Sequence, residues 1–200
     1  ASGQLRCAMF KRAAQMLESS VQGLRVLPIS GGVEVDKFST LPEPAQALRK
    51  LLYVGRLDRE KHVYVLLAAL AKVPANLDVS LEVVGSGSQS SELVKLAAEL
   101  GIQDRVNFAG ELSDSDMLAK LGESSVFVMP SIQELQSMAT LEAMAAGRPI
   151  IAANAMALPH LVHDGENGFL FRPDSPSDLA VKIQHIFDLP AKQFDQLSQG

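Results

Sequence analysis

The sequence predicts an α/β fold with a doubly wound parallel sheet. Short runs rich in apolar and β-branched residues recur along the chain, and each is too short for a helix and is bounded by turn residues. Segments with helical spacing lie between these runs. Strands that alternate with helices of about this length are typical of right-handed βαβ units, whose parallel sheet is covered on both faces. These observations predict a Rossmann-like domain.

Five strands and five helices are expected in alternation. The strands are "LLYVG" (51–55), "VSLEVVG" (79–85), "RVNFAG" (105–110), "SVFVMP" (125–130) and "PIIAAN" (149–154). The helices cover about 62–73, 90–100, 114–122, 137–146 and 176–188. In open sheets of this kind, ligands bind at the carboxyl ends of the strands, where helix N-termini point amide groups outward. The residues that follow each strand are therefore the places to search for a site.

The first fifty residues are less regular. Residues 4–18 are expected to be a helix, "LRVLPI" (24–29) a strand, and "SGGVEVDKF" (30–38) a loop in which two glycines allow a sharp turn. We expect residues 1–22 to be a helical segment or an interdomain linker remnant, and residues 23–200 to be the Rossmann-like domain. Because the chain begins with Ala1 rather than Met and ends on Gly200 without a tail, we expect a fragment of a longer protein.

Composition limits the partners. The 200 residues are 47% hydrophobic, which is enough for one core, so one main domain is expected. The net charge of −5 and the pI near 5.4 provide no overall basic field for nucleic acid, and an anionic ligand needs a local cluster of cations. The single cysteine, Cys7, fits a reducing compartment. The longest apolar run, 63–71, is far below the roughly 18 residues of a membrane span, so a soluble cytoplasmic protein is expected.

The first strand is followed by "GRLDREKH". Gly55 lets a backbone approach a ligand, while Arg56 and Lys61 place two cations beside the start of a helix, whose dipole also favours an anion. This loop could hold a diphosphate. The alternative is a polar loop with a solvated basic face.

The second strand is followed by "VGSGSQS". Gly85 and Gly87 resemble the start of a dinucleotide fingerprint, but Ser90 stands where the third glycine belongs. The pattern therefore disfavours NAD binding. It favours glycines that permit a tight turn before the helix, with backbone contact to a ligand left open.

Two features could indicate a metal but have simpler explanations. In "LSDSDMLAKL", Asp114 and Asp116 have a spacing that could ligate a metal, yet Ser113 followed three residues later by Asp116 is also a helix-capping pattern, which we favour. The four histidines are scattered and have no acidic partner at metal-ligand spacing: His62, His160, His163 and His185. No metal site is expected.

The stretch "ELQSMATLEAMAAG" (134–147) contains two carboxylates, Glu134 and Glu142. If all of it were helix, the two backbones would lie about 12 Å apart on faces that differ by roughly 80°. A retaining glycosidase pair needs carboxyl groups about 5–5.5 Å apart, so a hydrolytic pair is excluded on one straight helix. If the helix instead begins near Ser137 or Met138, the two acids could contact two parts of an elongated ligand whose phosphates lie over free helix amides. The alternative is one exposed loop glutamate and one exposed helix glutamate.

Six motifs together resemble the carboxyl-terminal, donor-binding half of a family 4 retaining glycosyltransferase of GT-B architecture. In order, they are "YVGRLDREKH", "LEVVGSGS", "RVNFAGEL", "VFVMPSIQE", "LEAMAAGRPIIAA" and "DGENGFLF". The resemblance covers most of the chain, from 24 to 180. It implies one half of a GT-B fold and a nucleoside-diphosphate sugar as the donor substrate, with no cofactor and no metal.

The resemblance also implies roles for single residues. Arg56 and Lys61 match the cations that hold the diphosphate and stabilise it as a leaving group, and Glu134 matches the acid that contacts the sugar hydroxyls near the reacting carbon. These three are the expected catalytic residues. The expected donor-binding residues are Glu142 at the ribose, the amides of Met138 and Ala139 at the phosphates, the main chain of Leu112 at the base, and Gly55, Gly85, Gly87 and Ser137.

The sequence departs from the family pattern at three places. "LQS" follows Glu134 where a glycine-bearing triplet is common, so the Cβ of Ser137 narrows the approach to the sugar. Met156 and Ala157 replace a glycine pair, and His62 stands where glycine is usual. The "ELQS" and "ALPHLV" variants are similar to a subgroup that includes glycolipid-forming enzymes, which is a hint about the acceptor. Separately, a peripheral position at the inner membrane face is an option for the full-length protein.

In the resembled family, the acceptor site lies in an amino-terminal domain, and we expect that domain to be missing from this chain. We therefore expect the chain to bind donor weakly and to transfer nothing alone. The full enzyme would move a sugar to a hydroxyl acceptor with retention at the anomeric carbon. Two alternatives stay open: a sugar-nucleotide epimerase or phosphorylase of related architecture, and a non-catalytic nucleotide-binding module.

Overall fold

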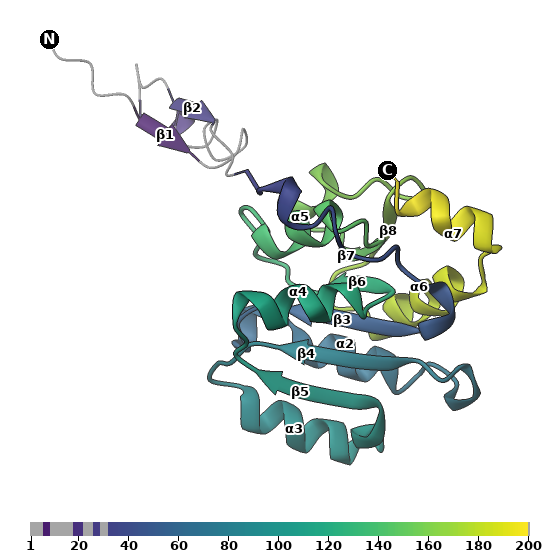
Figure 1. Cartoon of the computed structure of the whole chain (residues 1–200). Helices are drawn as coiled ribbons and strands as arrows, with labels where there is room; N and C mark the ends of the chain where they lie inside the picture. Colours follow the sequence, from purple (N-terminus) through teal and green to yellow (C-terminus); the bar gives the residue numbers. More distant parts are fainter. Residues whose placement is uncertain (1–5, 9–17, 22–25, 29–31, 200) are drawn as a thin grey trace, which may run out of the picture.

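A six-stranded parallel sheet forms the centre of the computed structural model, which describes the chain except for residues 1–5, 9–17, 22–25, 29–31 and 200 (Figure 1). Its strands are β3 (Lys50–Val54), β4 (Ser80–Val84), β5 (Val106–Gly110), β6 (Val126–Met129), β7 (Ile150–Ala153) and β8 (Gly168–Phe171). They lie in the order β5-β4-β3-β6-β7-β8, and every neighbouring pair is parallel. The predicted doubly wound, Rossmann-like sheet is confirmed.

The strand order reverses between β3 and β6. From β3 the chain adds β4 and β5 on one side, then crosses back to add β6, β7 and β8 on the other. The loops that follow β3 and β6 consequently diverge and leave a crevice at the carboxyl ends of these two central strands. In open α/β sheets, ligands bind in such a crevice.

Helices cover both faces of the sheet. They are α2 (Val63–Leu70), α3 (Ser90–Glu99), α4 (Asp114–Gly122), α5 (Met138–Ala145), α6 (Pro176–Asp188) and α7 (Ala191–Leu197). Helix α2 packs against α3 and α6, and Figure 1 shows α4 on the opposite face of the sheet. Every residue of β6 and β7 is buried, as expected for central strands of a parallel sheet that is covered on both sides.

Short 3-10 turns complete the described chain. They are η1 (Val35–Lys37), η2 (Gln46–Leu48), η3 (Arg59–Lys61), η4 (Ala75–Leu77), η5 (Gln103–Arg105) and η6 (Leu158–His160). Hydrogen bonds from two side chains hold the segment before β3 against the domain. Gln46 Nε2 donates to the carbonyl of Leu189 at 2.8 Å, and the buried Arg148 donates to the carbonyls of Ser124 and Pro42. This fastening holds η1 beside the carboxyl edge of the sheet.

The five expected strands and five expected helices are all present, with boundaries shifted by a few residues. Strand β8 and helix α7 were not expected. The run "GFLF" of β8 follows β7 with only the 3-10 turn η6 between them, so the alternation of strands and helices that reveals the other strands is absent here.

The helix expected over 4–18 is wrong at its start. Arg6–Ala8 is strand β1, which pairs in parallel with β2 (Val26–Pro28) in a separate two-stranded sheet. Pairing with a distant strand outweighs local helical spacing here, because strand formation depends on cross-strand context. Residues 9–17 of the expected helix lie outside the described residues, and 18–20 are helical. The strand expected within 24–29 is confirmed at β2, and the domain boundary at 22/23 stays a prediction.

Candidate functional site

Three adjoining hollows follow the carboxyl edge of the sheet. The first, of about 180 Å³, lies between the loops after β3 and β6, and the second, of about 540 Å³, extends toward the loops after β4 and β5. These two share Gly55 and Arg56 in their walls. The third, of about 250 Å³, lies beside α4 and α5 and shares Leu112 and Met117 with the second. Together they form one elongated depression, which we call the switch-point cleft.

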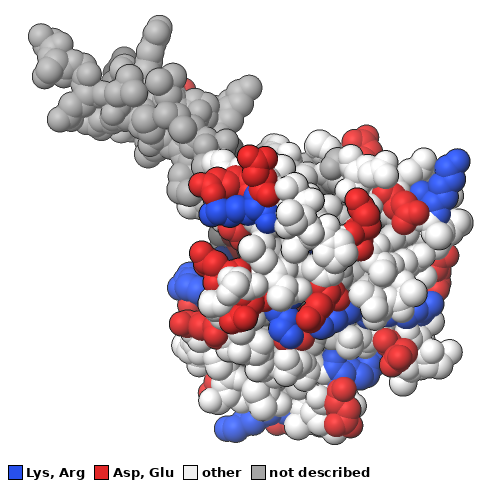
Figure 2. All heavy atoms as spheres, in the orientation of Figure 1, with Lys and Arg blue, Asp and Glu red and all other residues white. Residues whose placement is uncertain are grey.

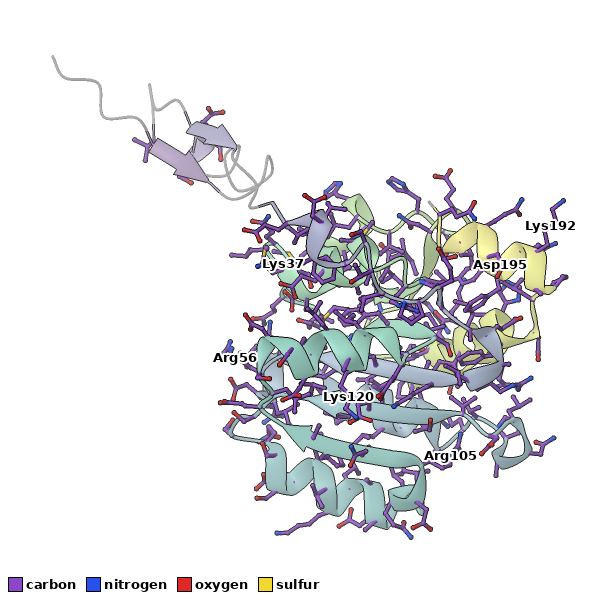
Figure 3. The ribbon with its side chains drawn as sticks, in the orientation of Figure 1. Lys37, Arg56, Arg105, Lys120, Lys192 and Asp195 are labelled. Carbon is purple, nitrogen blue, oxygen red and sulfur yellow. The ribbon has the colours of Figure 1, made fainter. Side chains whose placement is uncertain are left out.

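Every residue that the sequence predicts for the site lines this cleft. The first hollow contains Lys61, Glu134, Ser137, Met138 and Ala139; the second contains Gly85, Gly87 and Leu112; and the third contains Glu142. Figure 3 shows Arg56 and Lys37 at this edge of the domain and Arg105 at the opposite edge. On the face drawn in Figure 2, Lys and Arg lie among Asp and Glu rather than in one basic patch, so any attraction for an anion is local.

Lys61 and Glu134 form a largely buried ion pair in the first hollow. Lys61 Nζ lies 2.7 Å from Glu134 Oε1, and the side chains are 18% and 8% exposed. Lys61 ends the η3 turn after β3, whereas Glu134 belongs to the loop after β6. An ammonium group has three N–H donors and Glu134 uses one of them, so Lys61 can still donate to a ligand in the hollow.

Arg56 lies at the rim of the same hollow. Its side chain is 66% exposed, and its guanidinium pairs with Asp58 at 2.7 Å and with Glu60 at 2.8 Å. The two predicted cations therefore differ in setting: Lys61 is enclosed, and Arg56 has the solvated character of the alternative interpretation. The Arg56 side chain can leave these two ion pairs and turn toward a ligand at little cost, because exposed ion pairs of this kind contribute little stability.

Helix α5 begins at the wall of the first hollow. Ser137 is its N-cap residue, but the Ser137 hydroxyl forms a hydrogen bond with Thr140 Oγ1 at 2.7 Å and accepts no hydrogen bond from an amide of the first turn. The amides of Met138 and Ala139 thus carry the positive end of the helix dipole without a side-chain cap. The interpretation in which Glu134 precedes the helix and Glu142 lies along it is confirmed.

The glycines of the second hollow are required by close packing. Gly85 has φ +127°, and a Cβ there would lie 2.0 Å from the carbonyl oxygen of Gly55. A Cβ on Gly87 would lie 2.5 Å from the carbonyl carbon of Leu57. The loops after β3 and β4 touch at these points, with Leu57 N donating to Ser86 O at 2.8 Å. The predicted turn before the helix is present, with Ser90 N donating to Gly87 O at 3.2 Å, but it is the contact with the loop after β3 that requires the glycines. Both glycines also line the cleft.

Glu142 faces another acid in the third hollow. Burial, and then the charge of Asp114, raises the pKa of Glu142, whereas Lys37 acts in the opposite direction. The capping interpretation of "LSDSDMLAKL" is also confirmed: Asp116 N donates to Ser113 Oγ at 3.2 Å, and Ser113 Oγ donates to Asp116 Oδ2 at 2.7 Å. Asp114 nevertheless lines the cleft, because the first helical residue after a strand lies at this edge of the sheet.

A comparison with known protein families decides the identity of the domain. The family model described as glycosyl transferases group 1 matches residues 40–199, which is most of the chain. The chain belongs to the glycosyl transferases group 1 family.

Two curated relatives of this glycosyl transferase domain are enzymes. It is 34% identical over 173 residues to the MMP alpha-(1->4)-mannosyltransferase of Mycolicibacterium hassiacum, covering 86% of this chain and 41% of that protein. It is 33% identical over 186 residues to the D-inositol 3-phosphate glycosyltransferase of Streptomyces avermitilis, covering 84% of this chain and 40% of that protein. The chain therefore spans about two fifths of the length of these relatives.

A solved structure shows the shared fold. The crystal structure of HepE from Anabaena in complex with UDP and glucose has a TM-score of 0.83 to this domain and 24% identity. The match covers 97% of this chain and 56% of that chain. The glycosyl transferase domain has the Rossmann-like α/β fold found in GT-B glycosyltransferases.

Sequence reasoning missed several side chains in the cleft of the glycosyl transferase domain. Tyr53 lines the first hollow, and its hydroxyl donates to the carbonyl of Arg56 at 2.8 Å. Burial, and then the charge of Glu134, raises the pKa of this hydroxyl, so it stays protonated and keeps the backbone of Arg56 in place. Lys37 and Phe38 enter the third hollow from η1. The feature of the sequence that could have identified Tyr53 is its position one residue before the end of β3.

Within the described ranges, no group of three or more His, Cys, Asp or Glu side chains is arranged to hold a metal ion. In the same part of the chain, no helix is long and apolar enough to cross a membrane.

Proposed function

We propose that this chain is the donor-binding domain of a family 4 retaining glycosyltransferase, which moves a sugar from a nucleoside-diphosphate sugar to a hydroxyl acceptor. One observation carries the proposal. The Lys61–Glu134 pair, the open start of α5 and the acid Glu142 lie along a single cleft at the switch point of the sheet. The cleft offers a cation and helix amides for phosphates, with an acid on either side for hydroxyl groups.

The proposed ligand orientation follows from the order of the hollows. The sugar lies by Glu134 and Ser137 in the first hollow, and the diphosphate lies between Lys61 and the amides of Met138 and Ala139. The ribose lies by Glu142, with the base at the main chain of Leu112. HepE, which has the same fold, supports the class of ligand, because its structure was solved with UDP and glucose and also with UDP-glucose.

In the proposed reaction, the bond between the anomeric carbon and the diphosphate breaks, and the diphosphate leaves with additional negative charge. Lys61, Arg56 and the first amides of α5 stabilise that charge, and groups fixed before the reaction stabilise it most effectively. Glu134 accepts hydrogen bonds from sugar hydroxyls while it stays bonded to Lys61, because a carboxylate has about four acceptor positions. The proposal needs no metal and no cofactor.

The proposal assigns the acceptor site to an amino-terminal domain of the full-length enzyme. The 200 residues alone then bind donor weakly and transfer nothing. A carbohydrate or glycolipid acceptor and a cytoplasmic enzyme at the inner membrane face belong to the same proposal, which includes no nucleic-acid partner.

Full-length enzyme provides the test. Lys61→Ala should lower kcat/KM by on the order of 100-fold, because a preorganised cation at the leaving group is lost. Arg56→Ala should lower it less, and Lys72→Ala, which removes an exposed lysine after α2, is the matched control. The anomeric configuration of the product, measured by proton NMR, tests retention. Free epimer without acceptor, or a requirement for inorganic phosphate, would replace the proposal with an epimerase or a phosphorylase.

A further inference from the structure

His62, the residue directly after Lys61, has a backbone conformation that favours glycine. Its φ and ψ are +53° and +30°, in the left-handed region. Residues with a Cβ are uncommon in this region, whereas glycine enters it freely. The conformation breaks the chain between the η3 turn, which ends on Lys61, and helix α2, which begins at Val63. The orientation of Lys61 relative to the start of α2 therefore depends on the backbone of His62.

The side chain of His62 is anchored on its other side. The ring is buried, and Nδ1 lies 2.5 Å from Oδ1 of Asp174. The Tyr64 hydroxyl lies 3.1 Å from both of these atoms. An Nδ1–H of His62 and the O–H of Tyr64 can both donate to the carboxylate. The cluster of His62, Tyr64 and Asp174 is separate from the residues that line the switch-point cleft.

Asp174 brings a second helix to this point. It lies between β8 and Ser175, the N-cap residue of α6, and α6 packs alongside α2. The carboxylate therefore lies near the beginnings of both helices, where a negative charge is favoured by the helix dipoles. The bond from His62 to Asp174 ties the start of α2 to the start of α6.

We propose that His62 is a positioning residue for Lys61: its bond to Asp174 holds the left-handed backbone that directs Lys61 into the cleft against Glu134. The side-chain anchor replaces the conformational freedom that glycine would supply. The role of Lys61 in holding a donor rests on the proposed function, but the positioning of Lys61 does not. The structure thereby couples the loop after the edge strand β8 to the centre of the cleft.

The test measures the accessibility of Lys61 without any nucleotide. The 200-residue chain is labelled with an amine-reactive acetylating reagent, and the rate at Lys61 is followed by peptide mass spectrometry, with the exposed Lys72 and Lys95 as internal standards. Lys61 should label slowly in the wild-type chain. It should label roughly ten-fold faster in His62→Ala, which loses a hydrogen bond to a charged group and keeps a Cβ. In His62→Gly, protection of Lys61 should return, because glycine takes the conformation unaided.

Asp174→Ala removes the other partner of the hydrogen bond and is combined with His62→Gly. It should expose Lys61 when His62 is present and change little in the His62→Gly background, since no anchor is then needed. Asp78 is the control for backbone strain in the left-handed region, because it is an exposed residue with φ +52° at the opposite edge of the sheet. Asp78→Ala and Asp78→Gly should leave the labelling of Lys61 as it is in the wild type.

Two results overturn the proposal: Lys61 labels as fast in His62→Gly as in His62→Ala, or Asp174→Ala leaves Lys61 protected in the wild-type background. The second comparison also decides the matter if His62→Ala does not fold. Binding of UDP-glucose, GDP-mannose and ADP-glucose to the same variants is measured separately. If the labelling follows the expected pattern and none of the three nucleotide sugars binds, the positioning role stands and the proposed function fails.

Discussion

The ammonium group of Lys61 and the carboxylate of Glu134 lie 2.7 Å apart across the switch point of the sheet, although 73 residues separate them in the chain. Both side chains are largely enclosed. The pair joins the loop after β3 to the loop after β6, and so closes the inner end of the cleft. It is both a structural link and the feature on which the proposed chemistry depends.

Removing one member of this pair should destabilise the domain. Lys61→Met leaves Glu134 enclosed without its cation and should lower the free energy of unfolding by on the order of 2–4 kcal/mol. Lys61→Met with Glu134→Gln should recover part of this loss, because no uncompensated charge is left. Urea unfolding measures both effects. Equal stability of wild-type and Lys61→Met chains would show that the pair is not buried in solution.

Gly85→Ala should be among the most damaging substitutions in the domain. Its Cβ would lie 2.0 Å from the Gly55 carbonyl oxygen, so the loops after β3 and β4 must separate, at a cost of roughly 3 kcal/mol or more. Gly101→Ala is the matched control, because Gly101 also has positive φ, +68°, but has open space around it. It should cost only about 1 kcal/mol. Thermal unfolding of both variants checks the difference, and similar losses would contradict the packing argument.

Ser137→Gly should change the choice of donor sugar. It removes the side chain of Ser137 from the wall of the first hollow, and with it the hydrogen bond between Ser137 Oγ and Thr140 Oγ1. Thr140→Val is the control, because it removes the same bond without enlarging the hollow. Relative kcat/KM values of the full-length enzyme for a panel of UDP-, GDP- and ADP-sugars should shift in Ser137→Gly alone. The same ranking and ratios in both variants would remove Ser137 from sugar selection.

Glu142 should make stability depend on pH. Burial and the charge of Asp114 raise its pKa in the folded state, so the folded protein holds this proton more tightly than the unfolded chain does. The stability that this proton contributes is therefore fully present below the pKa of Glu142 in the unfolded chain, about 4.3, and is lost as the pH rises through its pKa in the folded protein. Glu142→Gln should raise the free energy of unfolding at pH 7.5 and change it little at pH 4.

Urea unfolding at the two pH values tests this expectation. Asp114→Asn should reduce the effect of Glu142→Gln at pH 7.5, since it removes the neighbouring charge. Glu99→Gln, on the exposed side of α3, is the surface control. A Glu142→Gln variant that is equally stabilised at both pH values would show that ionisation of Glu142 is not the cause.

Most of the sheet could be predicted because its strands are buried on both faces. The runs that became β6 and β7 are apolar throughout, and those of β3 and β4 are mostly apolar, with helices of clear spacing between them. Strand β8 was not predicted because no α-helix separates it from β7, and β1 was not predicted because its parallel partner lies about twenty residues further along the chain. In each case the missing information was a contact between distant segments.

The residues of the candidate site could be predicted, but their contacts could not. The resemblance supplied Lys61 and Glu134 separately, and nothing in the sequence indicated that they pair with each other. His62 stood where glycine is usual, yet only the structure shows that its backbone is left-handed and that Asp174 holds its ring. Met156, at another such position, is also left-handed, with φ +51°. At both positions the backbone has a conformation that favours glycine, although the residue is not glycine.

The binding of a nucleotide sugar in the switch-point cleft is tested most directly by NMR. The ¹⁵N-labelled chain is titrated with UDP-glucose, GDP-mannose and ADP-glucose, and the amide shifts are assigned. The account predicts saturable shifts for one of them that concentrate at Gly55, Gly85, Leu112, Met138 and Ala139, and that are weakened in Lys61→Ala. Saturable shifts centred away from these amides, or no saturable shift with any of the three, would contradict it.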